Sequence, residues 1–326
     1  MIETYTDIFK GVVSVAEENG VYTPFRLTQK QLERYKGLPK CPFSNACAGI
    51  KMEFITDAHE ISFGYTYRSI WTHFEGNTPT FDFYVNGVFA DAIKIEMDKL
   101  GEKLYMSFKF EKELAENKIT VYLPHNAAVS IFDLSIGNYT LPAEKKRKLL
   151  VLGDSISQGL MGDTSSVSYT ENYARFFDME ILNLSVGGDC YDETAIDEEL
   201  PYKPTDIIIA LGTNDVAMIC DYELIVANMK KYMNKISSLY PDCDITVITP
   251  PAQLTWEETD IEKHKMIEDF RGAIRLESEK YGFLCLDAKK LLPAAQRFYT
   301  DDAHPNDSGF SQYALNLIKA KLQSKG

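Results

Sequence analysis

The sequence has few of the features that mark membrane, metal-binding or secreted proteins. No stretch is long and apolar enough to span a bilayer, and the start, MIETYTDIFK, carries Glu3 and Asp7 where a signal peptide has an apolar core. Six cysteines occur without CxxC spacing, so we expect free thiols and no metal site, with Cys243 and Cys285 buried in apolar runs. These absences favour a cytoplasmic protein with no membrane partner.

Basic residues are also in short supply. Lys and Arg number 34 against 48 Asp and Glu, so the net charge is −14. Such a surface repels phosphate backbones, and nucleic acid is therefore not an expected partner. The remaining composition, 45% hydrophobic and 25% charged, is typical of a globular protein, and the length favours two domains. Nothing in it implies a cofactor, and a homo-oligomer stays open.

The first part of the chain has the pattern of an all-β domain. Within residues 21–136, short segments rich in aromatic and β-branched residues recur, several alternating with period two. They are residues 48–56, 60–68, 80–85, 88–95, 103–110, 118–124 and 128–136. Asn86-Gly87 between two of them indicates a type I′ hairpin. We expect an antiparallel β-sandwich of jelly-roll type over residues 1–140, followed by a polar linker over 138–148.

After Lys148 the pattern becomes alternating strand and helix. Apolar strands are predicted at 148–152, 179–184, 206–211, 244–249 and 283–287, and helices at 221–240, 257–281 and 307–322. This alternation predicts a parallel sheet covered on both faces. We expect an α/β domain over residues 148–326 with a flavodoxin-like, doubly wound sheet of five strands.

Polar blocks follow the ends of the first three of these strands. They read GDS (153–155), NLSVGGD (183–189) and GTND (212–215), and a fourth block, DDAHPND (301–307), lies between the last strand and the last helix. Each block alone is explained as well by turn or capping chemistry. Four such blocks at the edge where parallel sheets place their ligands are not comfortably explained by turns.

The four blocks resemble those of the GDSL esterases, also called SGNH hydrolases. The resemblance covers about the last 180 residues, from Lys148 onward. It implies that Ser155 is the nucleophile, that His304 is the general base and then acid, and that Asp301 orients His304. It further implies an oxyanion hole made of the Ser155 and Gly188 N–H groups and the Asn214 side-chain amide.

Neighbouring polar residues receive no role in the chemistry. Asp302 lies too close to His304 for the D-x-x-H spacing and is expected to face solvent, while Asp154 and Asp215 are expected to brace their turns. The other histidines have packing or surface roles by default: His59, His73, His125 and His264.

The substrate is predicted less directly. A β-sandwich joined to this hydrolase domain resembles the two-domain carbohydrate esterases of the family, although some of those lack the acidic triad member that Asp301 supplies here. Their likeness implies a serine esterase that removes acetyl or other short acyl groups from an oligosaccharide. Tyr65, Tyr67, Trp71 and Phe74 form either a sugar-stacking platform or, as is commoner, sandwich core. Trp256 either lines the pocket or covers a helix start.

Two other functions are compatible with the sequence. The first is a short-chain acyl-ester or thioester hydrolase without sugar preference. The second is a glycan-binding protein whose hydrolase domain has lost activity, and the presence of all four blocks argues against it.

Overall fold

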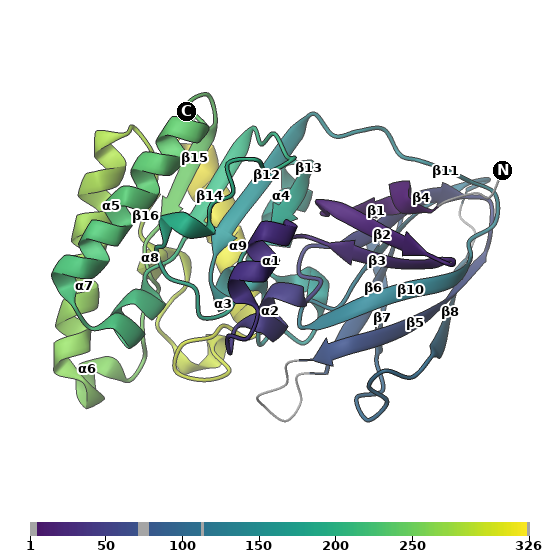
Figure 1. Cartoon of the computed structure of the whole chain (residues 1–326), viewed down its shortest axis with the longest axis horizontal. Coiled ribbons are helices and arrows are strands. Elements are labelled where there is room, and N and C mark those ends of the chain that lie inside the picture. Colours follow the sequence, from purple (N-terminus) through teal and green to yellow (C-terminus); the bar gives the residue numbers. More distant parts are fainter. Residues whose placement is uncertain (1–4, 71–77, 112–113, 325–326) are drawn as a thin grey trace. The chain divides into compact units, whose positions relative to one another are not determined.

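The computed structural model of the chain (Figure 1) describes residues 5–70, 78–111 and 114–324. The chain forms two compact units, Met1–Lys146 with Asp163–Ser166, and Arg147–Gly162 with Val167–Gly326. Each unit has a hydrophobic core of its own.

The first unit contains two antiparallel sheets. One has the order β1 (Phe9–Lys10), β4 (Lys51–Thr56), β9 (Asn117–Tyr122), β6 (Thr80–Val85), β7 (Val88–Lys94), with β11 (Tyr139–Thr140) also paired to β4. The other has the order β2 (Ser14–Glu18), β3 (Val21–Phe25), β10 (Ala127–Ser135), β5 (Glu60–Ile70), β8 (Leu104–Lys109). The antiparallel sandwich predicted from the sequence is therefore confirmed.

Aromatic side chains from both sheets meet in the core of this unit. The ring of Phe81 on β6 lies 5.3 Å from that of Phe63 and 5.1 Å from that of Tyr65, both on β5, between ring centroids. Tyr65 and Tyr67 are almost fully buried here, so these two belong to the core and not to a sugar platform. Trp71 and Phe74 lie outside the described residues.

Two features of the first unit show how local sequence directs the chain. Asn86 and Gly87 both have positive φ, 51° and 82°, as the predicted type I′ turn between β6 and β7 requires. Two short helices, α1 (Gln29–Tyr35) and α2 (Cys41–Asn45), interrupt the region expected to be all-β. The expectation overlooked a capping box, in which Thr28 Oγ1 accepts from Gln31 N–H and Gln31 Oε1 accepts from Thr28 N–H.

The second unit contains one parallel sheet of five strands. Its order is β13 (Met179–Asn183), β12 (Arg147–Gly153), β14 (Asp206–Ala210), β15 (Asp244–Ile248), β16 (Leu284–Leu286). In chain order this is 2-1-3-4-5, so the predicted flavodoxin-like sheet is confirmed. The strands read as apolar runs because helices cover both faces.

Long amphipathic helices α5 (Tyr222–Leu239) and α7 (Ile261–Lys280) pack together on one face of this sheet, and α4 (Tyr169–Phe176) packs with α9 (Asp307–Gln323) on the other (Figure 1). On α9 the buried residues Phe310, Tyr313, Ala314, Leu317 and Lys321 occupy positions i, i+3, i+4, i+7 and i+11, which lie on one face of a helix. The shorter helical segments include α3 (Ser155–Gln158), α6 (Trp256–Thr259), α8 (Ala288–Leu291) and the π-helical turn η4 (Asp215–Ile219).

All six cysteines are free thiols. Within the part of the chain that the structure describes, no helix has both the length and the apolar character needed to cross a bilayer.

We expect Phe81→Ala to lower the free energy of unfolding of the first unit by about 3–5 kcal/mol, because it leaves a cavity between the two sheets. Phe89→Ala is the matched control, since Phe89 lies on β7 with half of its surface exposed. Urea denaturation followed by circular dichroism measures both variants. Equal losses would contradict the assignment of Phe81 to the core.

Candidate active site

The turn after β12 depends on Gly153, which lies very close to Ser157 and to the backbone of Ala210. A Cβ on Gly153 would lie 2.4 Å from Ser157 Oγ and 3.0 Å from the carbonyl oxygen of Ala210, so only glycine fits. Asp154 then caps α3, its Oδ1 accepting from Ile156 N–H at 3.0 Å. Ser155 is the first residue of α3 and is half-buried. The strand end and the cap together place its hydroxyl at the carboxyl edge of the sheet.

The block at 301–307 brings His304 to this serine. Ser155 Oγ lies 2.9 Å from His304 Nε2, and His304 Nδ1 lies 2.8 Å from Asp301 Oδ2. Asp301 Oδ1 also accepts the backbone N–H groups of Ala303 and His304, which fixes the carboxylate against its own turn. The three side chains predicted as a triad are therefore hydrogen-bonded in series, with the geometry of a Ser-His-Asp arrangement.

Gly188 lies in the loop after β13, with φ of +80° that favours glycine. The N–H of Gly187 donates to Gln158 Oε1 and that of Asp189 donates to the carbonyl of Val186. Between them, the Gly188 N–H has no acceptor among the described residues. The Ser155 N–H, at the first position of α3, likewise has none there, as is usual at a helix start.

Asn214 follows β14 and is oriented by the loop that carries Gly188. Its Nδ2 donates to the carbonyl of Asp189 at 3.1 Å, which occupies one of the two amide hydrogens. The buried Asp215 joins the same two loops, because its Oδ1 accepts from Tyr191 N–H at 3.0 Å. The side chain of Asp215 thus braces the site, as its sequence position suggested.

The two carboxylates near His304 differ in their electrostatics. Burial alone would raise the pKa of Asp301, but hydrogen bonds and charge from His304, with the N–H of Ala303, outweigh it and hold the pKa at about 2. Burial raises the pKa of Asp154 to about 6, against the lowering effects of the Ile156 N–H and of His304. Asp301 is thus a stable anion beside the imidazole, whereas the pKa of Asp154 is about 6.

Several supporting residues were not identified from the sequence. Asn183 Nδ2 donates to the Ser157 carbonyl at 2.8 Å and Asn183 Oδ1 accepts from Ser185 N–H, which ties the Gly188 loop to α3. Gln158 holds Gly187 in the same way. Asn183 opens the second block, so its place in that motif was an available signal. Nothing local distinguished Gln158.

A buried arginine supports the neighbouring strand end. Arg271 on α7 donates from Nε to the Pro250 carbonyl at 2.8 Å and from Nη2 to that of Pro251, while Nη1 bonds Glu268. Pro250 packs against Gly212, where a Cβ would lie 2.7 Å from Pro250 Cγ. Pro250 and Pro251 also line a small cavity, about 10 Å³, with Asp154 and Thr213. Arg271 therefore fixes the wall against which the Asn214 turn rests.

The other residues considered from the sequence lie away from these contacts. Asp302 is exposed, as predicted. Trp256 is the first residue of α6 and is half-buried, with the Lys263 ammonium 5.9 Å from its ring centroid, which favours the helix-covering role. Of the remaining histidines, His59 is exposed, His125 is buried in the first unit, His264 lies on α7, and His73 lies outside the described residues.

A parallel 2-1-3-4-5 sheet with serine, histidine and aspartate hydrogen-bonded at its carboxyl edge places the second unit among α/β proteins with a Ser-His-Asp site. Residues 151–311 match the GDSL-like Lipase/Acylhydrolase family. These residues therefore form a GDSL-like lipase/acylhydrolase domain. A comparison with curated proteins finds no match to the sequence.

Solved structures resemble the chain over nearly its whole length. The salicylyl-acyltransferase SsfX3 from a tetracycline biosynthetic pathway is 16% identical, with a TM-score of 0.84 over 97% of this chain and 94% of that one. A family two carbohydrate esterase from Clostridium thermocellum, in complex with cellohexaose, is 16% identical with a TM-score of 0.65, over 94% and 99%. An acetyl xylan esterase from the rumen bacterium Butyrivibrio proteoclasticus is 15% identical with a TM-score of 0.61, over 95% and 97%. At these identities the likeness is one of fold.

Asp154→Asn should change how stability depends on pH. The pKa of Asp154 is raised from 3.8 to about 6 in the folded state, so the protonated carboxyl favours folding below about pH 4 and this contribution is lost as the pH rises through about 6. Asparagine cannot ionise and keeps an oxygen for the Ile156 N–H. Relative to wild type, the variant should therefore gain roughly 2–3 kcal/mol between pH 4 and pH 7.

Urea denaturation at several pH values tests this, with the exposed Asp242→Asn as the control. Asp301, whose pKa is lowered, contributes its own dependence only as the pH falls from about 4 to about 2, so the two windows are separate. If the stability of Asp154→Asn depended on pH as that of the wild type does, the raised pKa of the Asp154 carboxyl would be contradicted.

Arg271→Gln should lower the turnover of an activated ester about ten- to hundredfold. Without the guanidinium the Pro250–Pro251 wall and the Asn214 turn should shift, and small shifts of catalytic groups reduce rates by such factors. Steady-state kinetics measure it, and KM should change less than kcat. Arg275→Gln, an exposed arginine on the same helix, is the control. Wild-type kinetics in a folded Arg271→Gln protein would show that the Pro250–Pro251 wall does not depend on this guanidinium.

Proposed function

We propose that the chain is a serine esterase that removes short acyl groups, chiefly acetyl, from carbohydrate substrates. We assign the reaction to a catalytic domain of residues 148–326, accompanied by a sandwich domain of residues 1–140. Ser155 Oγ attacks the ester carbonyl while His304 takes its proton, and His304 then protonates the departing alcohol. Water, activated by the same imidazole, releases the acid from the acyl-enzyme.

The observation that carries the proposal is the unbroken series of hydrogen bonds from Ser155 Oγ through His304 to Asp301. A serine hydroxyl is a weak nucleophile until a base accepts its proton. The low pKa of Asp301 supports its role, because a carboxylate that stays ionised stabilises the imidazolium formed in the reaction.

The oxyanion would be stabilised by three donors. The N–H groups of Ser155 and Gly188 have no acceptor within the described residues, and the Asn214 amide keeps a second hydrogen beyond its bond to the Asp189 carbonyl. Ser155 also begins α3, where the exposed N–H groups favour negative charge. Each such donor contributes about 3–4 kcal/mol to the transition state in comparable sites.

The choice of substrate rests on the solved structures of similar fold. One is of a carbohydrate esterase in complex with cellohexaose and another of an acetyl xylan esterase, both covering more than nine-tenths of this chain. An acetylated oligosaccharide is therefore the substrate class that we assign. A short-chain ester or thioester hydrolase without sugar preference is the alternative within the same chemistry.

A second candidate is acyl transfer to an alcohol other than water. The salicylyl-acyltransferase matches this chain with a TM-score of 0.84. An acyl-Ser155 intermediate would serve both reactions, and they differ only in which hydroxyl attacks it. Product analysis in the presence of sugar or phenol acceptors separates them.

Ser155→Ala should reduce hydrolysis of p-nitrophenyl acetate at least about a thousandfold, because the nucleophile is removed.

Asn214→Ala should lower kcat about a hundredfold or more with KM little changed, since its amide acts on the transition state. Hydrolysis rates of the acetate, butyrate and octanoate esters, and of acetylated xylooligosaccharides, measure both the activity and the preference for acyl length and for sugar.

Ser238→Ala, an exposed serine on α5, is the matched control and should behave as wild type. Activity that survives Ser155→Ala would overturn the mechanism. A preference for octanoate would keep the mechanism but overturn the deacetylase assignment.

A further inference from the structure

A groove of the second unit lies at the end of the sheet opposite to Ser155. It has a volume of about 570 Å³ and is lined by residues from four segments. These are the end of α5, the start of β15, the α7–β16 turn and the end of α9. A groove of this size is large enough for a small organic molecule.

Three helices end at this groove. The residues that follow their last turns, Tyr240 after α5, Tyr281 after α7 and Ser324 after α9, all belong to its lining. The carboxyl end of each helix carries a partial negative charge from its aligned peptide dipoles. Because the helices run antiparallel to the strands, these three ends converge there and favour a positive charge.

Aromatic rings in the lining of the groove also favour a positive charge. Tyr240, Tyr281 and Phe283 are half-buried in the lining, and the rings of Tyr281 and Phe283 are stacked with centroids 5.5 Å apart. The ammonium of Lys280 lies 5.0 Å from the centroid of the Tyr281 ring. Tyr281 thus already has one cation near its ring, as the negative face of an aromatic ring allows.

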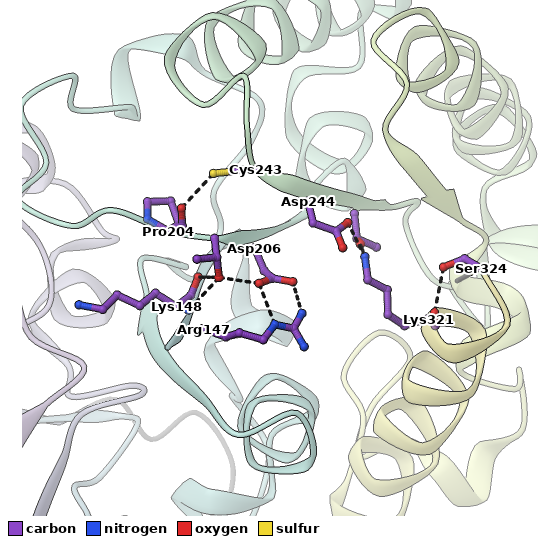
Figure 2. Close-up of polar contacts among 10 residues, drawn as sticks. Arg147, Lys148, Pro204, Asp206, Cys243, Asp244, Lys321 and Ser324 are labelled. Carbon is purple, nitrogen blue, oxygen red and sulfur yellow. Dashed lines mark hydrogen bonds and ion pairs between the residues drawn. The ribbon is translucent and has the colours of Figure 1, made fainter. Parts of the chain in front are cut away.

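The groove also contains a cation built into the fold. Lys321 points from α9 toward the start of β15 (Figure 2), where its Nζ lies 2.6 Å from Asp244 Oδ1 and 3.0 Å from Thr246 Oγ1. Its side chain is 3% exposed, so the ammonium is held almost without water at this end of the sheet. Asp244 is only partly covered, with 37% of its side chain exposed.

Burial, and after it nearby negative charge, raises the pKa of two groups beside the groove. Burial raises the pKa of the Cys243 thiol, and the carboxylates of Asp206 and Asp242 raise it further. Burial raises the pKa of Tyr240, with Cys243 and Asp197 adding to the effect. The Cys243 thiol donates to the Pro204 carbonyl and Asp206 pairs with Arg147 (Figure 2). Added negative charge is therefore disfavoured here.

We propose that this groove binds a small organic cation, whose ammonium group lies against the Tyr281 and Phe283 rings near the ends of α5, α7 and α9. The site is separate from Ser155 and does not depend on the esterase assignment. Its ligand class is an alkylammonium compound, because the rings contact the carbon substituents while the helix ends favour the charge.

Choline titrated into the full-length protein, followed by NMR chemical shifts, tests this proposal. The matched probe is the uncharged isostere in which carbon replaces the ammonium nitrogen. Both titrations are run at about 0.15 M salt, which screens weak attraction to the acidic surface. We expect choline to bind at least roughly fivefold more tightly than the isostere, with shifts at Tyr240, Tyr281 and Phe283.

Variants separate the groove from the rest of the molecule. Tyr281→Leu and Phe283→Leu should each weaken choline binding at least about threefold, while Tyr281→Phe, which keeps the ring, should not. Tyr222→Leu, a partly exposed tyrosine at the start of α5, is the control. Ser155→Ala should bind choline as wild type does, so loss of esterase activity and loss of this site are distinguishable.

Equal affinity for choline and its isostere would overturn the proposal, as would shifts confined to residues outside the groove. Wild-type affinity in both leucine variants would overturn it as well.

Discussion

The parallel pairing of β12 with both β13 and β14 is the constraint on which the candidate active site depends. Val151 pairs with Asn183 and Gly153 with Ala210, so the three strands end at nearly the same level. The turns that follow therefore meet at one edge, although they are separated by many residues in the sequence. Ser155, Gly188 and Asn214 each follow one of these strands.

The strand ends alone would not hold the side chains in a reactive arrangement. Buried polar contacts do so: Asp154 caps α3, Asn183 and Gln158 tie the Gly188 loop to that helix, and Asp215 joins the loops after β13 and β14. These bonds pair buried polar groups of the loops with one another. The Ser155 and Gly188 N–H groups have no acceptor within the described residues.

The two ends of the same sheet have opposite electrostatic character for one reason. Helices of a parallel α/β unit run against the strands, so helix starts such as that of α3 lie at the carboxyl edge and helix ends lie at the amino edge. The first edge favours an oxyanion and the second a cation. Ester hydrolysis at one edge and cation binding at the other would use the same fold in two ways.

The sequence by itself determined the classes of both units and, through its resemblance to the GDSL esterases, the candidate residues Ser155, Asp301 and His304. Hydrophobic period identified the β-sandwich and the five parallel strands, because that period follows directly from which faces are buried. The short blocks around Ser155, Asp301 and His304 were recognisable because a turn, a cap and a D-x-x-H spacing are local features. The helices α1 and α2 were missed, although the capping box at Thr28 and Gln31 was legible.

Only the tertiary structure decided the contacts between segments distant in the chain. Arg271 reaches the carbonyls of Pro250 and Pro251, and Lys321 reaches Asp244, across separations of about 20 and of 77 residues. The sequence around Arg271 and around Lys321 contains no local signal that identifies these contacts. Such pairs form because sheet order and helix packing bring their elements together, and the cost of burying a charge then selects the partner that satisfies it.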